Sequence, residues 1–107
     1  MTEEALKKLR GYMGLCVRAG QAVFGMDGCL NSLRKGEAGV LLLDAAASEG
    51  TRKKYADVCR TAGVPLAELP EDLLEEATGR SGMAMAVKKG GLCGQILSLT
   101  AGKAEIS

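Results

Sequence analysis

Apolar residues follow two different patterns along this chain. Near the N-terminus, Leu6, Leu9, Met13 and Cys16 follow helical spacing, with lysines and an arginine on the opposite face. Residues 39–44, GVLLLD, form an unbroken apolar run instead, which is typical of a strand buried on both faces. The first pattern predicts a helix and the second predicts a central strand.

Glycines and capping residues set the boundaries of the remaining elements. Ser48 is a predicted N-cap, Gly36 and Gly63 are predicted to end helices, and Pro70 fits the first turn of another helix. The expected helices cover residues 3–19, 27–34, 51–62, 71–78 and 92–99. The expected strands cover residues 21–24, 39–44, 64–69 and 83–87. This alternation predicts one α/β domain over residues 1–107, built as an α/β/α layered sandwich, with residues from about 100 frayed.

The composition allows one domain and restricts the kind of partner. A chain of 107 residues with 47% hydrophobic side chains is long enough for a single compact core. It carries 14 basic and 13 acidic residues, so it lacks the overall basic excess of many nucleic-acid-binding proteins. Any site for RNA must therefore be a local patch.

The cysteines and the N-terminal segment exclude several other classes. Cys16, Cys29, Cys59 and Cys93 form no CxxC pair, and the chain has no histidine, so neither a metal site nor another cofactor is expected. We expect four buried, reduced thiols. The N-terminal segment MTEEALKKLR is charged, and no apolar run approaches membrane-spanning length, so the expected location is cytoplasmic, with no membrane partner.

One segment, residues 15–36, combines a glycine turn with the start of a helix. Gly25 and Gly28 allow the backbone to approach a ligand closely. The first free N–H groups of the helix that follows carry a partial positive charge that attracts anions. A phosphate group is the obvious candidate ligand.

A second glycine turn, also beside a basic residue, precedes the last expected strand. Gly79 and Gly82 bracket Arg80 and Ser81. Such a turn can form an anion-binding nest with Arg80 forked onto a phosphate, although a tight connection from helix to strand has the same sequence.

Two further charged features, one single aspartate and one basic cluster, are interpreted as solvated surface. Asp44 ends the GVLLLD strand, where α/β domains often place catalytic groups, but too few acidic neighbours are present for a magnesium site. We expect a solvated strand end. Arg52, Lys53 and Lys54, joined by Arg60, are expected to form the solvated face of their helix.

The order of motifs along the chain resembles the kink-turn RNA-binding ribosomal protein family, the large-subunit "L seven Ae" and "L thirty e" group, and especially its small stand-alone bacterial members. The resemblance rests on the ordered segments RAGQAVFG, RKGEAGVLLLDAAASEGTRKKYADVC, AGVPL and LLEEATGRSGMAMAV. It implies an α/β/α sandwich with a small mixed four-stranded sheet. It also implies a ribosome-associated, non-enzymatic protein that binds bent RNA rather than DNA.

The resemblance further implies which residues contact RNA. The groove-contacting residues at the helix start are Gly25, Met26, Asp27, Gly28 and Asn31. The loop that caps extruded bases is formed by Arg80, Ser81, Gly82 and Met83. Independently of the resemblance, the positive charges of four residues can neutralise phosphates and would make binding salt-dependent: Arg18, Arg34, Lys35 and Arg80. Gln21 stands where the family often has a lysine.

The chain departs from the family at the residues that contact the RNA groove. Family members commonly have Asn, Glu and Lys where this chain has Asp27, Gly28 and Asn31. A carboxylate that accepts hydrogen bonds from guanine edges is therefore absent at Gly28, and Asp27 adds negative charge near phosphates. The alternative function is a protein-interaction module of the same fold, with a ribosomal or other protein as partner. An enzyme that uses Asp44 or the glycine turns is the third hypothesis.

Overall fold

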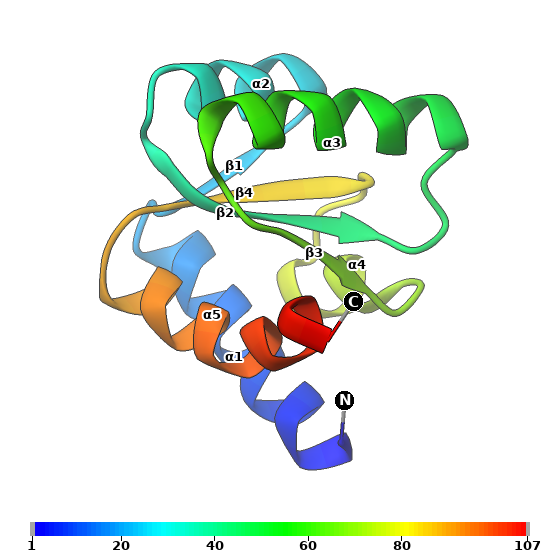
Figure 1. Cartoon of the computed structure of the whole chain (residues 1–107). Helices are drawn as coiled ribbons and strands as arrows, with labels where there is room; N and C mark the ends of the chain where they lie inside the picture. The colour runs from blue at the N-terminus through cyan, green and yellow to red at the C-terminus, as the bar shows by residue number, and fades with distance from the viewer. Residues whose placement is uncertain (1, 107) are drawn as a thin grey trace.

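Helices and strands alternate along the chain, as the hydrophobic pattern predicts (Figure 1). The computed structural model describes the backbone of residues 2–106 and the side chains up to residue 100. The helices of this part are α1 (Glu3–Arg18), α2 (Met26–Arg34), α3 (Glu49–Ala62), α4 (Leu73–Thr78) and α5 (Gly91–Ile106). The strands are β1 (Ala22–Phe24), β2 (Ala38–Asp44), β3 (Leu66–Leu69) and β4 (Ala84–Lys88).

The strands form one mixed sheet between two helical layers. Their order is β1-β4-β2-β3, in which β4 is antiparallel to both neighbours and β2 is parallel to β3. Helices α2 and α3 cover one face of the sheet, and α1, α4 and α5 cover the other (Figure 1). The α/β/α sandwich with a mixed four-stranded sheet is thus confirmed.

Strand β2 shows why an unbroken apolar run is needed at the centre. Val40 and Leu42 pack into the core beneath α1, α4 and α5, whereas Leu41 and Leu43 pack into the core beneath α2 and α3. All four side chains are fully buried. Because successive side chains of a strand point to opposite faces, a two-sided core requires apolar residues at every position.

The four cysteines are buried and free, as predicted. Cys16 and Cys93 lie in the core beneath α1 and α5, whereas Cys29 and Cys59 lie in the core on the other face of the sheet. Burial raises the pKa of Cys16 to about 11 and that of Cys59 to about 11. These two thiols are therefore neutral near pH 7 and act as small apolar core residues.

The predicted helix boundaries were wrong at the start of α4. The sequence places Pro70 in the first turn, but α4 begins only at Leu73, whose N–H donates to the Pro70 carbonyl at 3.2 Å. Asp72 adopts a left-handed conformation, with φ of 69°, and this turn precedes the helix.

At the C-terminus, the backbone of α5 continues to Ile106, beyond the predicted end at residue 99. Thr100, where fraying is expected to begin, is buried, and the side chains that follow it lie outside the described residues.

The prediction of a solvated Asp44 was wrong. The residue is only 4% exposed, and both carboxylate oxygens accept backbone hydrogen bonds. Oδ1 accepts from the Ala46 N–H at 2.7 Å, and Oδ2 accepts from the Asp72 N–H at 3.2 Å. Asp44 therefore ties the end of β2 to the turn before α4.

The basic stretch at the start of α3 is solvated only in part. Lys53 and Lys54 are exposed, as expected, but Arg52 forms an ion pair with Glu68 of β3. Arg52 also donates to the Ala45 carbonyl at 3.0 Å. It therefore links α3 to the sheet.

Within the described residues, none of the helices has the length and apolar character needed to cross a membrane.

Candidate nucleic-acid interface

The two glycine turns, distant in sequence, meet in the structure. They enclose one pocket of about 230 Å³. Its lining residues are Gly25, Met26, Thr51, Tyr55, Ser81, Gly82, Met83 and Ala84. The pocket therefore brings together the start of α2, the loop before β4 and the first half of α3.

Pairing of β1 with β4 explains this meeting. Phe24 is opposite Met85 in the antiparallel register, so β1 ends where β4 begins. Gly25 leaves one strand at that end, and Ser81 to Met83 enter the other. Two neighbouring strands thus hold both turns at one end of the sheet.

The start of α2 is open to a ligand. Gly25 has a φ of 84°, which favours glycine, and it provides no side chain to cap the helix. The Cys29 N–H donates to the Gly25 carbonyl at 2.9 Å, so the N–H groups of the first turn precede the intrahelical ladder. Asp27, in the same turn, is exposed. The site therefore combines free N–H donors with one carboxylate.

The lining of the pocket includes two large exposed hydrophobic side chains. Met26 is 36% exposed and Met83 is 44% exposed. Among the residues whose side chains are described, the other large exposed hydrophobic residue is Leu15, on α1, at 43%. Flexible, polarizable methionine side chains are well suited to cover a flat apolar ligand surface.

The side chain of Arg80 does not line this pocket. Its guanidinium carbon lies 4.6 Å from the centroid of the Phe24 ring. Phe24 packs against the core beneath α1, whereas Ala84, in the pocket wall, belongs to the core beneath α2 and α3. Arg80 therefore contacts the opposite face of the sheet from the pocket, at the end of the same strand.

Two pocket residues, Thr51 and Tyr55, were missed from the sequence as site residues. Both come from α3, and Tyr55 is only 2% exposed. Burial, followed by the neighbouring Cys29, raises the pKa of Tyr55, so its hydroxyl stays neutral near pH 7. The inward position of Tyr55 follows from helical spacing, but no local sequence signal shows that it lines a pocket together with a distant loop.

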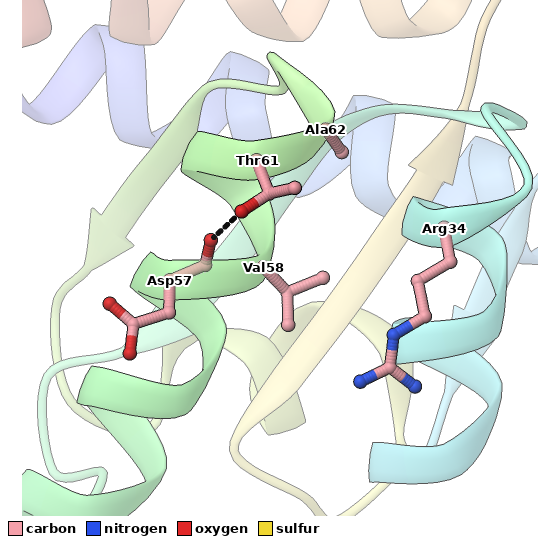
Figure 2. Close-up of a pocket in the computed structure, with 5 residues that line it drawn as sticks. All are labelled: Arg34, Asp57, Val58, Thr61 and Ala62. Carbon is pink, nitrogen blue, oxygen red and sulfur yellow. Dashed lines mark hydrogen bonds between the residues drawn. The ribbon is translucent and has the colours of Figure 1, made fainter.

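Three predicted residues lie further along α2. Asn31 is exposed one turn after Gly28, and Arg34 and Lys35 are exposed at the C-terminal end. Arg34 lines a separate pocket of about 410 Å³ between α2 and α3, where Val58 projects into the gap between the helices (Figure 2). Arg34 and Lys35 are thus at the far end of α2 from the methionine-rimmed pocket.

Two predicted residues lie at the other end of β1. Arg18 is in the last turn of α1, and Gln21 precedes β1, whereas Gly25 follows it. Gln21 lines a different pocket with Gly91, Leu92 and Gln95. The structure therefore places Gly25, Met26, Ser81, Gly82 and Met83 around one pocket, with Asp27, Gly28 and Arg80 adjacent in the chain, and does not bring Arg18, Gln21, Arg34 or Lys35 to it.

The α/β/α sandwich of this chain is similar to that of other solved structures. A protein of unknown function from Bacillus halodurans is 24% identical with a TM-score of 0.81, over 86% of this chain and 95% of its own. The Giardia lamblia 15.5kD RNA binding protein is 19% identical with a TM-score of 0.76, over 99% of this chain and 92% of its own. At these identities, the likeness shows the fold. No family model matches the sequence, and no curated protein matches it.

Proposed function

We propose that this protein binds RNA, and that it recognises a sharply bent RNA of the kink-turn type. The observation that carries the proposal is the pocket formed jointly by the start of α2 and the loop before β4, with its exposed methionine rim. These are the two segments that the family resemblance assigns to RNA contact. The shared fold of the Giardia lamblia 15.5kD RNA binding protein supports the same class of ligand.

The chemistry of the site suits an RNA with unpaired bases. Extruded bases expose flat apolar faces, which Met26 and Met83 can cover. The N–H groups at the start of α2 can donate to phosphate or base oxygens. Because the net charge is only +1, affinity must depend on this local geometry rather than on a general attraction to polyanions.

The proposed RNA is a bent segment associated with the ribosome, in line with the resemblance. No catalytic role is proposed. Asp44, the carboxylate best placed for one by its position in the fold, is buried and holds two backbone N–H groups.

A protein-interaction module of the same fold is the second candidate. Exposed Asp27 in the first turn of α2 favours it, because a carboxylate there repels phosphate. Exposed Met26 and Met83 would then form the apolar centre of a protein interface. Binding of the protein to a kink-turn RNA separates the two candidates.

Met83→Ser is expected to lower the affinity for a kink-turn RNA by roughly three- to tenfold, because the serine cannot cover an extruded base. Leu15→Ser is the matched control, since Leu15 is equally exposed but lies on α1. The control is expected to bind within about twofold of the wild type. Fluorescence anisotropy with a labelled RNA measures both. Equal losses for the two variants would count against base contact at the pocket rim.

A further inference from the structure

Arg80 is held by an aromatic ring rather than by an acidic partner. Its guanidinium lies over Phe24, 4.6 Å from the ring centroid, within the range of a cation–π contact. The three ion pairs of the described residues involve other cations. Its backbone N–H donates to the Thr78 hydroxyl at 3.2 Å, so the start of the loop is tied to α4. The N–H donors of the guanidinium therefore remain available for a ligand.

Phe24 is anchored well enough to orient this side chain. The ring is half-buried and packs against the core beneath α1. It is the one phenylalanine of the chain, and it lies between Val23, which packs against the core on the opposite face of the sheet, and the turn residue Gly25. A fixed ring restricts the rotamers of a guanidinium placed over it, so less conformational entropy is lost when that guanidinium binds.

We propose that Phe24 is a positioning residue that presents Arg80 as a preoriented fork for an RNA phosphate. The inference rests on the proposed function. A stacked guanidinium keeps its planar edge available, and that edge matches two oxygens of a phosphate. The fork and the methionine-rimmed pocket lie on opposite faces of the sheet at the same end of β1. An RNA strand with a base in the pocket passes around this end of β1 and brings a neighbouring phosphodiester to Arg80.

A double-mutant cycle tests the proposal, with Phe24→Leu, Arg80→Ala and the double variant titrated against a kink-turn RNA at several salt concentrations. Arg80→Ala is expected to weaken binding roughly tenfold or more and to reduce the salt slope by about one phosphate contact. Phe24→Leu is expected to weaken binding about two- to fivefold. The double variant should bind no more weakly than Arg80→Ala, and Phe24→Tyr should bind like the wild type.

The cycle distinguishes positioning from simple core packing. If Phe24→Leu weakens binding by the same factor whether or not Arg80 is present, the ring acts only through the fold and the proposal is overturned. If the wild type itself binds the kink-turn RNA no better than an RNA without its G·A pairs, the proposed function fails first, and the phosphate fork fails with it.

A second measurement needs no RNA. Protons of the Arg80 side chain over an aromatic face are shifted upfield in the proton NMR spectrum. We expect this shift in the wild type and in Phe24→Tyr, and its loss in Phe24→Leu. Unshifted Arg80 protons in the free wild-type protein would overturn the preoriented fork even if RNA binding is confirmed.

Discussion

Asp44→Ala is expected to lower the free energy of unfolding by about 3 kcal/mol, the largest effect we predict for a single polar substitution. The carboxylate accepts two backbone N–H groups, from Ala46 and Asp72, in a setting where only 4% of the residue is exposed. Alanine leaves both donors without this acceptor, and the turn before α4 loses its link to β2. Chemical denaturation followed by circular dichroism measures the change.

Asp57→Ala is the matched control for this prediction. Asp57 is also an aspartate with a short contact, to Arg60 at 2.7 Å, but both side chains are largely exposed on α3. An exposed ion pair contributes little, so the control should stay within about 0.5 kcal/mol of the wild type. If Asp44→Ala is no more destabilised than Asp57→Ala, the structural role of the buried carboxylate is wrong.

The combined substitution Gly28→Glu with Asn31→Lys is expected to raise the affinity for a kink-turn RNA by roughly 10- to 100-fold. These changes supply the carboxylate and the cation that the family commonly has at the start of this helix. A Cβ at residue 28 meets Val23 Cγ1 at 3.0 Å, so Val23, on edge strand β1, must shift by a few tenths of an ångström. Asn31 is exposed and has room for lysine.

The control for this gain places the same two charges elsewhere. Gly94 and Ser98 are exposed on α5, and a Cβ at residue 94 meets no atom within 4 Å. Gly94→Glu with Ser98→Lys should leave RNA affinity unchanged within about twofold. A gain that appears in both double variants, or in neither, contradicts the assignment of the start of α2 as an RNA-contacting edge.

Much of the fold could be predicted because its determinants are local. The unbroken apolar run before Asp44 identifies the central strand, and Ser48 was correctly predicted to cap α3: its hydroxyl accepts from the Thr51 N–H at 3.2 Å. Gly63 likewise ends α3 in a left-handed conformation. Each of these features depends on residues a few positions apart, so a single sequence contains enough information to predict it.

The errors concern contacts between distant segments. Asp44 was predicted to be solvated because nothing near it in sequence shows that the turn at Asp72 will cover it. The same turn delays the start of α4 beyond Pro70. The stack of Arg80 on Phe24 was also missed, because it requires the antiparallel register of β1 and β4. Burial of a polar group and pairing across a sheet are properties of the assembled chain.

The candidate site shows the same division. The two glycine turns were identified from sequence, and the structure brings them to one pocket. Met26 and Met83, which lie at the rim of this pocket, were also among the predicted site residues. The predicted cations Arg18 and Arg34 lie elsewhere on the surface. They were assigned to the site because they are close to it in sequence, but a strand or a helix can separate neighbouring segments in space.

The central claim, specific recognition of bent RNA, is tested most directly by titrating the wild-type protein with two RNAs of equal length. One forms a kink-turn, and the other lacks the tandem G·A pairs and stays unbent. We predict at least about tenfold tighter binding to the kink-turn RNA at moderate salt, because shape-dependent contacts persist when general electrostatic attraction is screened. Equal affinity for the two RNAs would contradict the proposed function.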